Sequence, residues 1–346
     1  GYIDRLIIYI IDFINQIFAN INLLQIFLFV SGAIIAILYL LSLANKTIVN
    51  KDLNSSDLLI RNRERSSLKR KTKFTDLLNE YKSGVFLLVC LNLLIAIINA
   101  IDIYWVWFNF KWDGSYLKEF VHEGTYILII AILFSILIVL FFFRANLNFY
   151  SKNKTLIILS YLWLIQNGIM TLSVAIRNIW YIKFNNLAYL RLFVFAFLLL
   201  TLFGLLTVFI KIKYKKSEYF IFRKNSLAAY LMLCFLALIN WDNFIAKYNI
   251  SNSKKAYFHY DFMVTMPDRV LPVLYENYYL FDKEFNKKDY HEYVFNEFNI
   301  NDSIKNYKQL LEIKKRRFIS NYETRNWRSW NYADFKAYHS VIGNKK

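Results

Sequence analysis

The feature that most constrains this chain is a set of uninterrupted apolar runs, each close to 20 residues long. An α-helix rises about 1.5 Å per residue, so roughly 20 apolar residues are enough to cross the hydrocarbon core of a bilayer. Composition agrees, because 57% of the 346 residues are hydrophobic and only 2 Pro and 8 Gly are present to make turns. A water-soluble fold rarely has such a composition. The sequence therefore predicts an all-α, polytopic transmembrane bundle.

The apolar runs predict about six spans. They are placed at about 22–44, 84–108, 125–143, 156–180, 190–210 and 225–246. Residues 1–21 carry charges within an apolar pattern, which suits a helix that lies at the membrane surface or packs on a partner. The chain begins with Gly1 and not with Met, so we expect a fragment or a processed form of a longer protein.

Charge in the loops predicts the orientation of the spans. The loop 45–82 contains ten basic and five acidic residues, a net charge of +5, and basic loops face the cytoplasm. The loop 109–123 has two basic and three acidic residues, a net charge of −1, which favours the outer side. Alternation of six spans then places residues 247–346 outside, which is the periplasm if the host has two membranes.

The segment 247–346 contains no spanning run and is predicted to be a small, aromatic-rich helical domain. Pro272 suits the first turn of a helix ending near Leu280. Apolar residues at near-helical spacing over 304–318, behind a run of capable N-cap residues, predict a second helix. A third helix is expected over 290–298.

Some ionisable residues fall inside predicted spans, where a charge is costly and needs a partner. By the topology above, Asp102, Arg177 and Asp242 share the outer third of the membrane. An ion pair of Arg177 with either aspartate would keep both charges ionised and hold spans two, four and six together. The alternative is a proton or ion pathway through the same residues.

The span 156–180 also carries a polar stripe along its length. Gln166, Asn167 and Asn178 belong to it, together with Ser160, Thr171, Ser173 and Arg177. A polar face at this depth must contact protein or water and not lipid. We expect hydrogen bonds between helices, with the lining of a substrate cavity as the functional alternative.

Motifs for catalysis are sparse. His122 and Glu123 offer an imidazole and a carboxylate at the start of a span, but all four histidines lack a recognised zinc spacing. Glycine-rich phosphate loops and nucleophile elbows are absent from the sequence. We therefore expect no cofactor, no firm metal site and no enzymatic activity, with an outward-facing metal enzyme at His122 and Glu123 as a remote alternative.

The net charge of +18 would suggest nucleic acid in a soluble protein. Here cytoplasmic loops account for much of it, so no nucleic-acid partner is expected. The basic run Lys314, Lys315, Arg316 and Arg317 lies in the tail, where we expect a solvated face that contacts water, lipid headgroups or an acidic partner.

Several segments resemble domain-of-unknown-function family 4173, a group of multi-pass bacterial membrane proteins found largely in Bacteroidetes. The resemblance is carried by YWVWF (Tyr104–Phe108), EFVHEGTY (Glu119–Tyr126), FFRANLNFY (Phe142–Tyr150), IQN (Ile165–Asn167), RN (Arg177 and Asn178), NWD (Asn240–Asp242) and WRSWN (Trp327–Asn331). It implies several spans in a bacterial inner membrane. It implies no assigned activity, so it assigns no catalytic residue.

Two hypotheses for function follow. The leading one is a non-enzymatic inner-membrane sensor, scaffold or subunit of an envelope complex, which contacts membrane lipid and other membrane or periplasmic proteins. Its basis is the aromatic and Arg-rich outer tail, since these residue types dominate binding hot spots. The second is a transporter or proton-coupled machine that uses the intramembrane polar residues.

Overall fold

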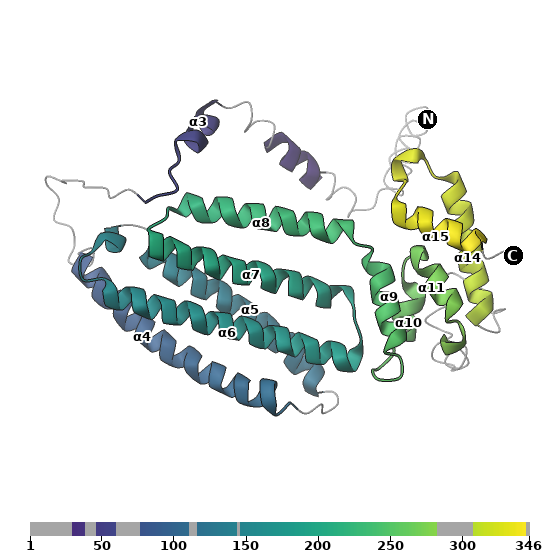
Figure 1. Cartoon of the computed structure of the whole chain (residues 1–346), viewed down its shortest axis with the longest axis horizontal. Coiled ribbons are helices and arrows are strands. Elements are labelled where there is room, and N and C mark those ends of the chain that lie inside the picture. Colours follow the sequence, from purple (N-terminus) through teal and green to yellow (C-terminus); the bar gives the residue numbers. More distant parts are fainter. Residues whose placement is uncertain are drawn as a thin grey trace, which may run out of the picture. The chain divides into compact units, whose positions relative to one another are not determined.

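The structure is a computed structural model that describes residues 30–38, 46–59, 77–110, 116–143, 146–281 and 307–343 (Figure 1). Within these ranges the secondary structure is helical, without a β-strand. The chain divides into two compact units, Gly1–Asp57 and Leu58–Lys346. The first contains a helix over 30–38 and α3 (Lys46–Asn54). The helix expected in 1–21, and most of the expected span 22–44, lie outside the described residues.

Long apolar helices make up the first part of the second unit. They are α4 (Leu77–Asp102), which continues as the π-helix η2 (Ile103–Phe108), α5 (Tyr116–Phe142), α6 (Lys154–Asn185), α7 (Tyr189–Tyr214) and α8 (Glu218–Leu238), with the short 3-10 helix η3 (Asn146–Phe149) before α6. Four of the described helices are long and apolar enough to cross a membrane, namely α4 with η2, α6, α7 and α8. The predicted fold class is confirmed: the chain is a helical membrane protein.

Helix α6 is the centre of this bundle. It packs against α4, α5 and α7, while α8 packs on α7 (Figure 1). The buried positions of α4 recur every three or four residues, at Gly84, Leu88, Asn92, Ile95, Asn99 and Asp102. This spacing places them on one face of the helix. Gly84 permits the closest approach, because a Cβ atom added there would lie 3.0 Å from the ring of Phe142.

The expected span 225–246 differs from the structure at its C-terminal end. Helix α8 ends at Leu238, and Ile239 adopts an extended conformation. The side chain of Asn240 then accepts a hydrogen bond from the backbone N–H of Asn243 and caps a new helix, α9 (Trp241–Ser251). A cap at this point competes with helix continuation, so Asp242 belongs to α9 and not to a membrane span.

The tail consists of short helices around an aromatic core. After α9 come α10 (Tyr260–Thr265), the 3-10 helix η4 (Asp268–Val270), α11 (Leu271–Glu276), α14 (Tyr307–Thr324), the 3-10 helix η5 (Trp327–Ser329) and α15 (Tyr332–Gly343). Pro272 lies in the first turn of α11 as predicted, although α11 ends at Glu276. The described part of the expected helix over 304–318 is α14, and the helix expected over 290–298 lies outside the described residues.

The core of the tail does not stop at the expected boundary between residues 246 and 247. Ile245 and Ala246 of α9 are fully buried in the same cluster as Leu271, Leu274 and Phe318. Ile182 and Leu187, at the end of α6 and just after it, join that cluster too. The C-terminal domain, defined here as 241–343, is therefore built against one end of the bundle, which we call the domain end.

Candidate functional site

Asp102 and Arg177 form a buried ion pair between α4 and α6. A guanidinium nitrogen of Arg177 donates a hydrogen bond to Oδ1 of Asp102, and the side chains of Arg177 and Asp102 are only 5% and 7% exposed. A buried charge is tolerated when it is paired. Of the two partners expected for Arg177, Asp102 is the one that Arg177 contacts in the structure. The pair joins spans two and four of the prediction.

Further polar contacts extend this pairing along the interface of α4 and α6, which we call the polar seam. Gln166 donates a hydrogen bond of 2.7 Å to Oδ1 of Asn92, and Asn99 donates one of 3.0 Å to the carbonyl of Gln166. Nearer the domain end, the indole of Trp107 donates to Ser173 at 2.9 Å. Amide and hydroxyl groups thus connect the two helices over several turns.

Other members of the expected cluster point elsewhere. Asn178 donates a hydrogen bond of 2.9 Å to the carbonyl of Arg191 in α7, so it joins α6 to a different helix. Asn167 donates to the carbonyl of Trp163 within α6 itself. Both side chains are buried. The polar stripe therefore faces protein on all of its described positions, but it does not form a single cluster.

Asp242 lies in a separate set of contacts at the junction of bundle and tail. It accepts a hydrogen bond from the phenol of Tyr189, the first residue of α7. The Nε of Arg269 lies 3.4 Å from Oδ2 of Asp242 and 3.2 Å from Oδ1 of Asp334. Arg325 contacts the other oxygen of Asp334 at 2.5 Å. Of the two alternatives for Arg177, the structure thus shows the pair with Asp102, while Asp242 contacts Tyr189 and Arg269.

These five residues, Tyr189, Asp242, Arg269, Arg325 and Asp334, form what we call the junction network. Burial by itself raises the pKa of Asp334, but hydrogen bonds from Asn331 and Arg325 and the charges of two arginines bring that pKa below its usual value. Asp334 is thus held as a carboxylate. The network contains two aspartates and two arginines, so its charges cancel.

The basic run 314–317 was expected to form a solvated face, but Lys314 is buried. Its side chain is only 4% exposed, and Nζ donates a hydrogen bond of 2.5 Å to the carbonyl of Met266. Burial lowers the pKa of Lys314 to about 8, although the carboxylate of Asp268, 3.7 Å away, raises it in part. Lys314 holds α14 against the segment before η4, while Arg316 and Arg317 remain on the surface.

A metal site has no support among the residues that the structure describes, since no group of three or more His, Cys, Asp or Glu could hold an ion there. His122 and Glu123 fall inside α5, well after its first residue, Tyr116. Their side chains lie outside the described part of the chain, as does His291. The expectation for His122 and Glu123 is therefore neither supported nor opposed by geometry.

An exposed aromatic surface covers η5 and the start of α15. It consists of Trp327, Trp330, Tyr332 and Phe335, and Trp327 and Tyr332 are 80% and 67% exposed. Tyr332 also lines a cavity of about 320 Å³ together with Leu238 at the end of α8 and Arg269 of the junction network. The aromatic surface thus adjoins the end of a membrane span.

A comparison with protein families decides what kind of chain this is. The model of the domain of unknown function DUF4153 matches residues 2–277, which is most of the chain. The chain belongs to the DUF4153 family. No curated protein and no solved structure matches this DUF4153 chain. The resemblance to a family of unknown function is confirmed, but the family number expected from the sequence, 4173, is wrong.

Several site residues of this DUF4153 chain escaped the sequence analysis. Asn92 and Asn99 lie ten and three residues before Asp102, so their shared helical face could have been found from spacing alone. Arg269, Arg325 and Asp334 had no such signal. Arg269 lies 65 positions from Asp334 in the sequence, and the two residues meet because η4 packs against α15. Arg325 is nine positions from Asp334, in the segment that joins α14 to η5.

Proposed function

We propose that this membrane protein is a non-enzymatic sensor, scaffold or subunit of a bacterial cell-envelope complex that presents its C-terminal domain to a protein partner. The observation that carries the proposal is the aromatic surface of Trp327, Trp330, Tyr332 and Phe335. Clustered Trp and Tyr side chains supply large contact areas at a low entropic cost and are enriched in binding hot spots. Exposed patches of this kind mark interaction sites.

The junction network supports the same role. Because Tyr189 of α7 contacts Asp242, and Asp242 and Asp334 share Arg269, α15 is tied by polar contacts to the end of a membrane span. The aromatic surface at the start of α15 therefore has a defined position relative to the bundle. A partner that binds there would be held at a fixed height above the membrane.

The distribution of charged residues indicates on which side of the membrane the C-terminal domain lies and what kind of surface its partner has. The turn that joins α7 to α8, at the end of the bundle opposite the C-terminal domain, carries six basic residues and one acidic residue between 211 and 224. The positive-inside rule favours a cytoplasmic position for such a turn, so we propose that the C-terminal domain faces the periplasm. Lys315, Arg316 and Arg317 make the domain basic, so we expect a partner with an acidic and apolar surface.

Site-specific crosslinking in intact cells tests this proposal. A photoreactive phenylalanine at Trp330 or Tyr332 should yield one repeated adduct with a different protein. The matched control replaces Phe86, an exposed residue of α4 on the membrane bundle, with the same reagent, and should not yield that adduct. Adducts with lipid alone at Trp330 and Tyr332 would contradict a protein partner and make the surface part of the membrane-facing aromatic belt.

One observation favours transport as a second candidate. Four buried oxygens near the polar seam accept no hydrogen bond from the described residues, and they belong to Asn99, Asp102, Gln166 and Asn167. Buried oxygen atoms that accept no hydrogen bond can bind a proton, a water molecule or a cation. In liposomes under an imposed pH gradient, the wild-type protein should then conduct protons and Asp102→Asn should not. Equal flux in both, at the level of empty liposomes, would reject this candidate.

A further inference from the structure

We infer that the cavity between α6, α7 and α9 binds an anionic phospholipid, with the phosphate at Lys183 and Lys255 and the start of an acyl chain on the apolar wall. The cavity holds about 600 Å³, within the range of about 300–1,000 Å³ typical of small-molecule sites. It is separate from the aromatic surface, so the inference does not depend on the proposed protein partner.

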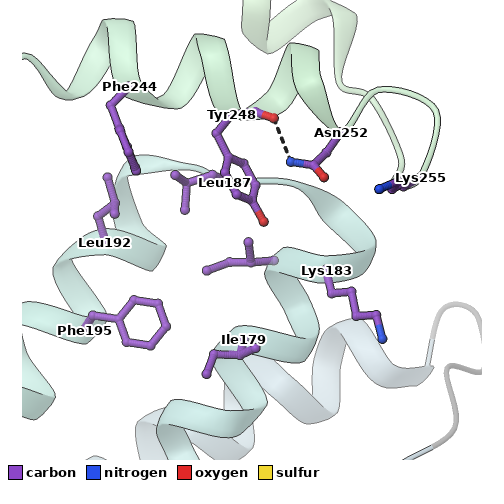
Figure 2. Close-up of a pocket in the computed structure, with 10 residues that line it drawn as sticks. Ile179, Lys183, Leu187, Leu192, Phe195, Phe244, Tyr248, Asn252 and Lys255 are labelled. Carbon is purple, nitrogen blue, oxygen red and sulfur yellow. Dashed lines mark hydrogen bonds between the residues drawn. The ribbon is translucent and has the colours of Figure 1, made fainter.

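The cavity has one apolar side and one polar side (Figure 2). Ile179 of α6, Leu192 and Phe195 of α7 and Phe244 of α9 form the apolar wall. Figure 2 shows Lys183 and Lys255 on the other side, where Lys255 lies near Asn252 and Lys183 lies apart from them on the end of α6. The amide of Asn252 already donates a hydrogen bond of 2.9 Å to the carbonyl of Tyr248. A ligand that fits both sides must itself be amphipathic.

The polar side favours an anion. Lys183 and Lys255 are both exposed, and neither forms an ion pair with a carboxylate among the described residues. Lys183 lies over the ring of Trp180, 4.7 Å from its centroid, which restricts where its ammonium group can be. Two lysines that line the same cavity attract a group with negative charge, and a phosphate diester carries one.

The position of the cavity along the helices favours a lipid over a soluble anion. Trp180 and Lys183 occupy the last turns of α6, and tryptophan and lysine are typical of the membrane–water interface. Ile179 lies about one turn before Lys183, and Phe195 about one turn beyond Leu192, so the apolar wall extends from the lysines toward the centre of the bilayer. A phospholipid has its charge and its chain in this same order.

Titration of the purified full-length protein with phosphatidylglycerol, followed by native mass spectrometry, tests this inference. At about 1 kcal/mol for each lysine near an anionic lipid, Lys183→Gln with Lys255→Gln should weaken binding about 25-fold. The matched control is Lys247→Gln with Lys254→Gln, which removes the same charge from the same region but changes no residue of this cavity. It should bind like the wild type. A second variant, Ile179→Trp, fills the apolar wall without a change in charge and should also weaken binding.

Three outcomes would overturn the inference. Equal binding by the wild type and by the double variant at Lys183 and Lys255 would show that these lysines hold no headgroup. Equal binding of phosphatidylcholine would show that negative charge is not recognised. Displacement of the lipid by soluble glycerol phosphate at similar concentration would show that the site holds a free phosphate ester and not a lipid. Matched melting temperatures across the variants ensure that lost binding is not lost folding.

Discussion

The phenol of Tyr189 donates a hydrogen bond to the carboxylate of Asp242, and this contact joins the first residue of a membrane helix to the C-terminal domain. Asp242 also lies 3.4 Å from Arg269, which in turn pairs with Asp334 of α15. A chain of polar contacts therefore runs from α7 through α9 and η4 to α15. It accounts for a domain that is fixed to the bundle and not merely tethered to it.

Tyr189→Phe removes only the donor of that contact. Hydrogen bonds to charged groups contribute about 1.5–3 kcal/mol, so we expect the free energy of unfolding to fall by this amount in denaturant titrations in mild detergent. Tyr214→Phe is the control, since Tyr214 is an exposed tyrosine at the other end of the same helix, and it should change stability by less than about 0.5 kcal/mol. The same loss in both variants would contradict the role of the Tyr189 contact.

Replacing one member of the Asp102–Arg177 pair leaves the other charge buried and alone. Arg177→Leu and Asp102→Leu should each destabilise the protein by about 3–5 kcal/mol. The double variant should be more stable than either single variant, because it leaves no unpaired charge. Thermal unfolding of the three variants in one lipid mixture checks this. If the losses simply add, the two residues do not act as a pair.

Two glycines of the bundle should respond oppositely to alanine. A Cβ atom at Gly84 would lie 3.0 Å from Phe142 and 3.2 Å from Leu156, so Gly84→Ala forces buried side chains to move. We expect a loss of about 1–3 kcal/mol. Gly168 of α6 has no atom within 4 Å of such a Cβ atom, so Gly168→Ala should be neutral or stabilising through helix propensity. A stable Gly84→Ala variant would show that α4 does not pack this closely.

Lys314 should make the stability of the C-terminal domain depend on alkaline pH. Its pKa is about 8 in the folded protein, below about 10.4 for an unperturbed lysine. Between these values the unfolded chain binds more protons than the folded chain, so this group makes the folded state more stable as pH rises. Relative to Lys314→Met, the wild type should gain about 1–3 kcal/mol of unfolding free energy from pH 8 to pH 10. If the unfolding free energies of the wild type and Lys314→Met change in parallel with pH, Lys314 does not have the lowered pKa of a buried lysine.

Much of the bundle could be predicted because apolar runs and loop charge report directly on membrane spans. The same reasoning predicted a carboxylate partner for Arg177, either Asp102 or Asp242, since a charge inside a span requires a partner. It failed at residues 239–242. There the predicted span runs past Leu238, but Ile239 is extended and the side chain of Asn240 caps a new helix. Hydropathy does not detect such a local polar contact.

The junction network could not be predicted for a different reason. Arg269 and Asp334 are 65 positions apart in the sequence, and they meet because η4 packs against α15. Neither residue lies in a span, where its charge would have demanded an explanation. The burial of Lys314 was missed in the same way, because the basic run around it has the pattern of a solvated helix face.

The measurement that tests the central proposal most directly is the mass and composition of the complex extracted gently from native membranes. The account predicts a second, different chain at a fixed ratio, and its loss when Trp330 and Tyr332 are both changed to Ala. The variant should retain its melting temperature, because these two side chains are largely exposed. A chain that is always recovered alone, or only with copies of itself, would contradict a role as a sensor, scaffold or subunit of an envelope complex.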